Sequence, residues 1–148
     1  MPAPPLPLSY KPGPARRAVS EKPSPRIFIC DDDLDFAMEL ANGLSMSGFE
    51  TKTLSAGCSM IEIFETFQPD MMLLDIFMPP PDGFEVINHI CNSAYKNIPI
   101  VLISGAGIGL LEVATRYCIG RKLRLAATFR KPLRIAEIAR VCDVHVRR

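Results

Sequence analysis

The stretch LLDIFMPPPDGFE at residues 73–85 decides the fold of this chain. An apolar run that begins at Met71 ends on the carboxylate of Asp75, and three consecutive prolines follow at 79–81. A continuous apolar run of this kind is typical of a strand that is covered on both faces, as in a parallel sheet. The stretch therefore predicts a central strand that carries Asp75 at its end. A stiff loop and a helix starting near Asp82 should follow.

Strand-like and helix-like segments alternate on both sides of this stretch. Short apolar runs predict strands, and apolar residues at helical spacing predict the helices between them. This alternation indicates parallel βαβ units with right-handed crossovers, so we expect an α/β, three-layer, doubly wound (βα)5 fold. The predicted strands are 26–30, 49–54, 71–75, 98–104 and 123–129, and the predicted helices are 34–48, 59–68, 83–95, 107–122 and 133–144.

The composition favours a single domain with one hydrophobic core and gives little further indication of function. The chain has 148 residues, 48% of them hydrophobic, and a net charge of +1. That charge gives no general reason to expect direct binding to nucleic acid or to a membrane surface. No apolar run approaches the roughly 18 residues of a membrane span. The five cysteines include no C-x-x-C pair, so we expect reduced thiols and a cytoplasmic protein.

The first 25 residues differ from the rest, because they hold eight of the fourteen prolines. Such a segment buries too little apolar surface to offset the entropy that ordering would cost. We therefore expect a disordered, proline-rich tail at 1–25 and a folded domain at 26–145. Residues 146–148 are either the C-terminal end or the start of a linker.

Polar residues follow four of the five predicted strands, at the edge where doubly wound sheets place their sites. Asp31 and Asp32 follow the first strand, Asp75 ends the third, Ser104 ends the fourth, and Lys131 follows the fifth. Crowded carboxylates repel one another and require a cation, and oxygen ligands suit Mg²⁺ better than zinc. A cation beside a lysine suits a phosphoryl group, so Asp75 could be a nucleophile that forms an acyl phosphate.

These motifs together resemble the receiver domain of two-component response regulators over residues 26–145. LLDIFMPPPDGFE is similar to the family's D-x-x-M-P-x-x-D-G pattern. IFICDDD, VLISG and FRKP are similar to the motifs of its first, fourth and fifth strands. The resemblance implies a flavodoxin-like sheet in the order 2-1-3-4-5. It also implies a bacterial, phosphorylation-dependent switch that catalyses its own phosphorylation and slow dephosphorylation but is not otherwise an enzyme.

The resemblance assigns Asp75 as the phosphoacceptor and places a metal ion beside it. Asp32 is then a direct ligand of Mg²⁺, or of Mn²⁺, and Asp31 assists through water. Asp75 and the backbone carbonyl of Phe77 complete the protein ligands. Asp33 lies at a position that varies in the family, and we assign it to capping the helix that follows.

The resemblance also assigns residues that detect the phosphoryl group. Ser104 is the switch hydroxyl, and Lys131 contacts the phosphoryl group, with the Lys131–Pro132 bond expected to be cis. Many receivers carry an aromatic residue three positions before the lysine. Here that position is Thr128 and the aromatic residue is Phe129, so these two residues form a modified switch face.

The partners expected from the resemblance are a sensor histidine kinase or phosphotransfer protein and an output domain or partner protein. The stretch GRKLRLAATFRKPL is weakly similar to receivers joined to EAL-type cyclic-di-GMP phosphodiesterases, so the output could be related to cyclic-di-GMP. A homodimer is also compatible with the sequence. Neither direct nucleic-acid binding nor membrane association is expected.

Two other functions compete with the switch. A phosphorylation-independent interaction module would need no intact pocket, yet every pocket residue is present. An Asp-nucleophile phosphohydrolase would need an acid-base residue two positions after Asp75, where this chain has Phe77.

Overall fold

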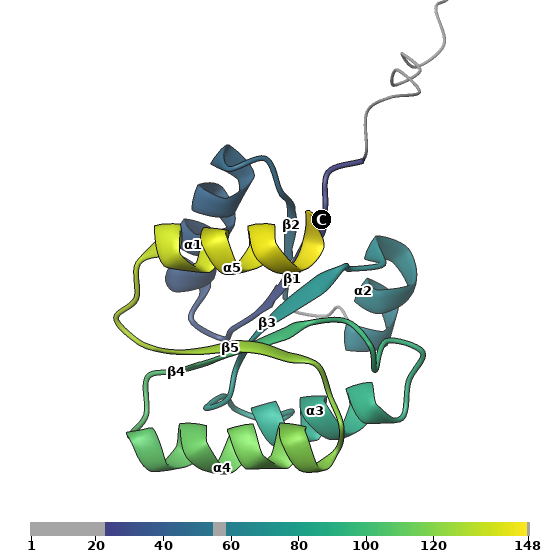
Figure 1. Cartoon of the computed structure of the whole chain (residues 1–148), viewed down its shortest axis with the longest axis vertical. Helices are drawn as coiled ribbons and strands as arrows, with labels where there is room; N and C mark the ends of the chain where they lie inside the picture. The colour runs from purple at the N-terminus through teal and green to yellow at the C-terminus, as the bar shows by residue number, and fades with distance from the viewer. Residues whose placement is uncertain (1–22, 55–58, 148) are drawn as a thin grey trace, which may run out of the picture.

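The computed structural model describes residues 23–54 and 59–147. Within them, parallel strands form one sheet in the order β2-β1-β3-β4-β5 (Figure 1). The doubly wound α/β fold and its strand order are therefore confirmed. The strands are β1 (Arg26–Cys30), β2 (Glu50–Thr53), β3 (Met71–Asp75), β4 (Ile100–Ser104) and β5 (Leu125–Arg130).

Helices cover both faces of the sheet (Figure 1). α1 and α5 pack on one face, while α2, α3 and α4 pack on the other. The three layers therefore enclose two hydrophobic cores that share the sheet. The helices are α1 (Leu34–Met46), α2 (Met60–Phe67), α3 (Gly83–Cys91), α4 (Ile108–Gly120) and α5 (Ile135–Val146).

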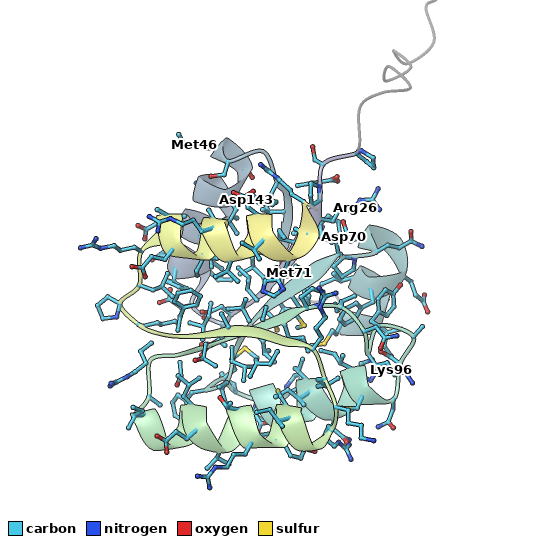
Figure 2. The ribbon with its side chains drawn as sticks, viewed as in Figure 1. Arg26, Met46, Asp70, Met71, Lys96 and Asp143 are labelled. Atoms are coloured by element: carbon cyan, nitrogen blue, oxygen red, sulfur yellow. The ribbon has the colours of Figure 1, made fainter. Side chains whose placement is uncertain are left out.

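The central strand β3 supplies side chains to both cores, and all of its residues are buried. Met72 and Leu74 belong to the core under α2, α3 and α4, whereas Met71 and Leu73 belong to the core under α1 and α5. Figure 2 shows side chains filling the space between the sheet and the helices, and it labels Met71 among them. Each fully buried apolar side chain of this size contributes about 1.5–3 kcal/mol, so β3 is strongly fixed in place.

Side-chain caps set the starts of three helices. Asp33 accepts a hydrogen bond from the backbone N–H of Phe36 at 3.1 Å, which confirms its predicted capping role for α1. Ser59 and Asp82 cap α2 and α3 in the same way. A capping side chain satisfies an otherwise unpaired helical N–H, so these helices begin close to their predicted positions.

The third helix is shorter than predicted. It ends at Cys91 and not at Tyr95. The hydroxyl of Ser93 donates to the carbonyl of Ile90 at 2.8 Å and accepts from the N–H of Tyr95 at 3.1 Å. A serine that bonds nearby backbone groups competes with the helical ladder, and here it replaces the last predicted turn with a bend.

Smaller differences occur at other element ends, mostly by one or two residues. α5 begins at Ile135 and extends to Val146, past the predicted end of the domain. The predicted tail at 1–25 lies outside the described residues except for 23–25. No helix in the described part of the chain has both the length and the apolar character that a membrane crossing requires.

We predict that Gly83→Ala destabilises the fold. A Cβ at Gly83 would lie 2.5 Å from the Cα of Ile76, so the start of α3 and the end of β3 would have to separate. Chemical denaturation should show a loss of about 1–3 kcal/mol, the usual cost of overpacking. Gly109→Ala in α4 is the matched control, because no atom lies within 4 Å of its added Cβ. The control should gain roughly 0.5–1 kcal/mol, and equal effects at both sites would contradict the prediction.

Candidate functional site

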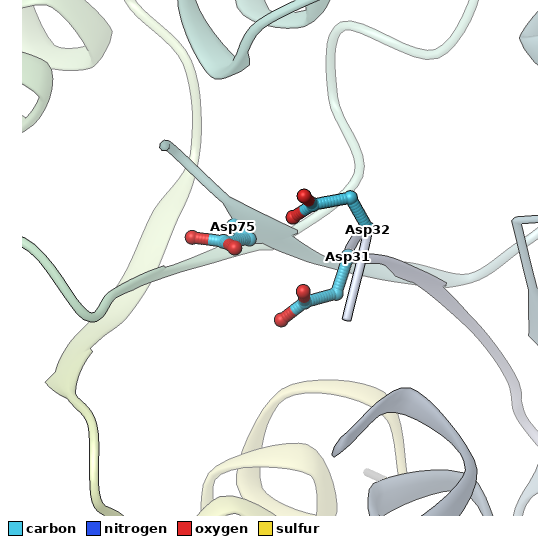
Figure 3. A group of neighbouring side chains, drawn as sticks. All are labelled: Asp31, Asp32 and Asp75. Atoms are coloured by element: carbon cyan, nitrogen blue, oxygen red, sulfur yellow. The ribbon is translucent and has the colours of Figure 1, made fainter. Parts of the chain in front are cut away.

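Three carboxylates meet at the carboxyl edge of the sheet (Figure 3). Asp31 and Asp32 follow β1, and Asp75 ends β3. Ligand oxygens of the three lie within 4.8 Å of one another. The strand register explains this closeness: Cys30 pairs with Leu74, so the next residue of each strand, Asp31 and Asp75, lie side by side.

The alternation of strand side chains places two of these carboxylates on the same face of the sheet. Asp31 continues the β1 row of Ile27 and Ile29, which faces α1 and α5. Asp75 continues the β3 row of Met71 and Leu73, which faces the same helices. Asp31 and Asp75 are both buried, while Asp32 is exposed to solvent.

Lys131 reaches the carboxylates from the end of β5. Its backbone N–H donates to the carbonyl of Ser104 at 2.9 Å, which extends the β4–β5 ladder by one residue. Its Nζ lies 2.8 Å from Oδ2 of Asp31 and donates to Oδ2 of Asp75 at 3.4 Å. One ammonium group therefore bridges the two buried carboxylates.

Burial is the main influence on the protonation of Asp75. Burial, reinforced by the charge of Asp31 and opposed by Lys131, raises the pKa of Asp75 to about 6. Burial alone would lower the pKa of Lys131, but the hydrogen bond to Asp31 and the charge of Asp75 reverse this and raise it. Burial also raises the pKa of the Cys30 thiol to about 12, with Asp31 adding to the effect, so Cys30 stays a neutral core residue.

The donor set fits a cation. Among the described residues, the cluster of three carboxylates has one ammonium beside it, that of Lys131, which contacts two of them, so an excess of negative charge remains. Oδ2 of Asp31 is buried and accepts no hydrogen bond of regular geometry from the described residues, although it forms the ion pair with Lys131. A buried carboxylate oxygen without a full set of partners is costly, and a hard divalent cation such as Mg²⁺ would satisfy it. Asp31, Asp32 and Asp75 are therefore able to hold such an ion.

A hollow of about 310 Å³ opens onto these groups. Asp32, Asp75 and Lys131 line it, together with Phe77, Gly105 and Ala106. The side chain of Phe77 is 71% exposed at the hollow. The three prolines at 79–81 do not line it, so they do not close the hollow beside Asp32 and Asp75.

Ser104 does not line this hollow, although sequence reasoning groups it with the site. It ends β4 and is fully buried, and its row of side chains, Ile100 and Leu102, faces α3 and α4. Its Oγ accepts a hydrogen bond from the N–H of Ala106 at 3.1 Å. That bond uses a lone pair of the oxygen and leaves the hydroxyl proton able to donate to another acceptor.

Thr128 and Phe129 lie on opposite faces of β5. Phe129 packs against the core under α1 and α5. Thr128 is exposed and lines a separate hollow between α4 and β5, with Ile108, Thr115 and Arg130 among its neighbours. The aromatic ring of this strand therefore lies on the face away from α4. The Lys131–Pro132 bond that follows is cis.

Sequence reasoning missed Phe36, which touches the site from α1. The ammonium of Lys131 lies 4.3 Å from the centroid of the Phe36 ring. Periodicity indicates only the buried stripe of α1, which consists of Ala37, Leu40, Ala41 and Leu44. Phe36 lies beside that stripe. Its position in the first helical turn after the acidic motif is the sequence feature that could have indicated its closeness to the site.

Comparison with known proteins agrees with this arrangement. The family described as "Response regulator receiver domain" matches residues 27–139. The Transcriptional regulatory protein PrrA of Mycobacterium leprae is 35% identical over 81 residues, which cover 55% of this chain and 34% of that protein. The Regulatory protein AtoC of Escherichia coli is 30% identical over 79 residues, covering 53% of this chain and 17% of that protein. This chain thus aligns with about a third or less of these relatives.

Solved structures share the fold. The chemotaxis protein CheY4 of Vibrio cholerae superposes with a TM-score of 0.70 at 17% identity, covering 83% of this chain and 99% of that one. The BeF3-activated receiver domain of Klebsiella pneumoniae RstA superposes with a TM-score of 0.68 at 20% identity, covering 83% and 99%. Because the family match extends from the first strand into the last helix, this chain belongs to the response regulator receiver domain family.

Proposed function

We propose that Asp75 is the residue on which this phosphorylation-dependent signalling switch accepts its phosphoryl group. One observation carries the proposal: Asp75 is a buried carboxylate that opens onto a hollow and is flanked by two more carboxylates and a lysine. Its place between β1 and β4 in the centre of the sheet holds it rigidly. A nucleophile in a fixed position beside groups that can bind an anion suits phosphoryl transfer.

The acidic cluster would hold Mg²⁺, with Mn²⁺ as an alternative. The carboxylates of Asp31, Asp32 and Asp75 and the carbonyl of Phe77 would be its ligands. When bound, the ion would offset the excess charge of the carboxylates and part of the charge of the phosphoryl group. The residues of this chain then position the reacting groups: Asp75 presents an oxygen to the phosphorus, and the ammonium of Lys131 is close enough to bind a phosphoryl oxygen.

The phosphoryl donor would be the phosphohistidine of a sensor histidine kinase or a phosphotransfer protein. In the transfer, a new O–P bond forms on Asp75 and the P–N bond to the histidine breaks. The histidine retains the bonding electron pair. The product is an acyl phosphate that carries about two negative charges. This chemistry makes the chain a phosphoacceptor that takes part in its own modification.

The phosphoryl charge would be transmitted to the α4–β5–α5 face. The hydroxyl proton of Ser104 is able to donate to a phosphoryl oxygen, and Lys131 would shift toward the new charge. Movement at the end of β4 would bias α4, and Thr128 lies at the hollow between α4 and β5. Because an aromatic residue is absent from that position, the movement would act on α4 packing without a swinging ring.

The remaining parts of the signalling pathway are also proposals. The relatives are longer than this chain, so we infer an output domain or partner protein, with cyclic-di-GMP signalling and homodimerisation as further possibilities. A cytoplasmic location is supported by the described cysteines, all of which are unpaired thiols.

We predict that the protein gains the mass of one phosphoryl group when it is incubated with acetyl phosphate and Mg²⁺. The gain should require the cation and should be absent from Asp75→Asn, because the amide cannot act as the nucleophile. Intact-protein mass spectrometry is the measurement. A gain that persists in Asp75→Asn would refute the assignment, and no gain in the parent protein would favour a phosphorylation-independent interaction module.

We predict a pH-dependent stabilisation by Asp75→Asn in the presence of EDTA. The folded chain binds a proton at Asp75 more tightly than the unfolded chain, because burial raises the pKa from 3.8 to about 6. This contribution to stability is complete below pH 3.8 and is lost as the pH rises through 6. Above that range, the ionised carboxylate destabilises the native state.

The variant should therefore be more stable than the parent at pH 8, by up to about 3 kcal/mol, and equal to it near pH 4. Urea denaturation at the two pH values measures the difference. Mg²⁺ at pH 8 should stabilise the parent more than the variant, so the difference between their free energies of unfolding should become smaller. A variant that is no more stable than the parent at pH 8 would count against this electrostatic picture.

We predict that Phe77 protects the acyl phosphate from water. Its apolar side chain lines the hollow beside Asp75, and excluding water slows hydrolysis. After removal of excess donor, Phe77→Asn should release inorganic phosphate several-fold faster than the parent, whereas Phe77→Leu should stay close to it. Equal rates in all three proteins would mean that Phe77 gives no protection.

A further inference from the structure

The ammonium of Lys131 has contacts of two kinds. On one side are the carboxylates of Asp31 and Asp75, at 2.8 and 3.4 Å. Close by, the centroid of the Phe36 ring lies 4.3 Å from Nζ. That distance is within the range in which a cation is attracted to the negative face of an aromatic ring. Within residues 23–54 and 59–147, this ammonium forms these two ion pairs and this one ring contact.

Lys131 stands between two hollows, so packing alone does not fix its position. On one side is the hollow above Asp75. On the other is a hollow of about 440 Å³ between α1 and the start of α5, which Phe36, Leu40, Lys131 and Leu133 help to line. A lysine stem has several rotatable bonds and loses considerable entropy when it is held in one position. Without directional contacts, Nζ would be able to swing into the second hollow.

The Phe36 ring is itself held in place. Phe36 lies in the first turn of α1, and its side chain is half-buried against the core under α1 and α5. The start of the helix is fixed by Asp33, whose carboxylate accepts a hydrogen bond from the backbone N–H of Phe36. The backbone that carries the ring is therefore fixed, and one part of the ring packs against the core.

The two kinds of contact respond differently to a cation. Asp31 is the nearest partner of Lys131 and is also part of the acidic cluster, so a divalent cation and the ammonium draw on the same carboxylates. The Phe36 ring has no oxygen and is not a ligand for a hard cation. Its contact with Lys131 thus stays available when the carboxylates bind an ion.

We propose that Phe36 is a positioning residue: its ring keeps the ammonium of Lys131 directed at Asp75 when the carboxylates are engaged by a divalent cation. This inference rests on the proposed function, because it presumes that Lys131 binds the phosphoryl group on Asp75. It adds a contribution from α1 to a site that otherwise comes from the ends of β1, β3 and β5 and the loop after β4.

The test compares Phe36→Leu, which keeps an apolar side chain but removes the ring, with Phe36→Tyr, which restores a ring. Phe49→Leu is the matched control. Phe49 belongs to the same core, and its ring also contacts a cation, because Cζ of Arg147 lies 4.0 Å from the ring centroid. Unlike Phe36, Phe49 is in the turn between α1 and β2. All proteins are tested for unfolding, for Mg²⁺ affinity by calorimetry, and for phosphorylation by acetyl phosphate at saturating Mg²⁺.

We expect phosphorylation to slow roughly fivefold in Phe36→Leu and to recover in Phe36→Tyr, as a partly buried cation–ring contact of this kind predicts. Mg²⁺ affinity should stay close to that of the parent in every variant. Phe49→Leu should lose stability but keep the parent rate. Equal rates in Phe36→Leu and Phe49→Leu would reduce Phe36 to a structural residue and overturn the proposal.

A second readout does not depend on activity. In ¹³C-lysine-labelled protein, the ε-methylene protons of Lys131 should show an upfield ring-current shift, with Lys131→Arg identifying the signal. The shift should remain when Mg²⁺ is added and should disappear in Phe36→Leu. Loss of the shift on adding Mg²⁺ to the parent would show that the contact breaks when the cation binds, which would also overturn the proposal.

These outcomes separate the two proposals. If the parent gains no phosphoryl group, or if Asp75→Asn still gains one, the proposed function is wrong. If phosphorylation depends on Asp75 but not on the ring at position 36, the proposed function stands and only the positioning role of Phe36 fails.

Discussion

The structure depends on holding like charges together at one edge of a sheet. Asp31 and Asp75 are buried side by side, and Asp32 lies close to both. Carboxylates in such a place repel one another and are poorly solvated, which is why the pKa of Asp75 is raised to about 6. The ammonium of Lys131 offsets part of this cost by bridging the two buried groups. The remaining excess of negative charge makes the cluster able to attract a cation.

The packing of the rest of the fold offsets the unfavourable free energy of the buried carboxylates. β3 is buried on both faces and is flanked by β1 and β4, so the carboxylate at its end has little freedom to move away from its neighbours. At the opposite edge, Arg26 and Asp70 (labelled in Figure 2) join β1 to the start of β3 by a hydrogen bond of 2.8 Å between the Arg26 N–H and the Asp70 carboxylate. The acidic edge is therefore anchored from the far end of the same two strands.

Much of this arrangement could be predicted from the sequence because it follows from periodicity and chain order. Apolar runs locate the strands, caps such as Asp33 locate the helix starts, and the parallel order brings Asp31, Asp75 and Lys131 to one edge. Contacts that depend on side-chain geometry were not predictable. The early end of α3 depends on how Ser93 bonds, and the Phe36 contact depends on how its ring packs beside Lys131. Sequence order places Ser104 at the same edge, but it does not predict that its side chain is fully buried and accepts a hydrogen bond from the N–H of Ala106.

The proposed switch requires that one carboxylate, that of Asp75, becomes an acyl phosphate. Borohydride reduction tests it most directly, because it converts an aspartyl phosphate into homoserine, and peptide mass spectrometry then locates that residue in the chain. After reaction with acetyl phosphate and Mg²⁺, we expect homoserine at position 75 and unmodified aspartate at 31 and 32. Homoserine at position 31 or 32, with Asp75 unmodified, would contradict it.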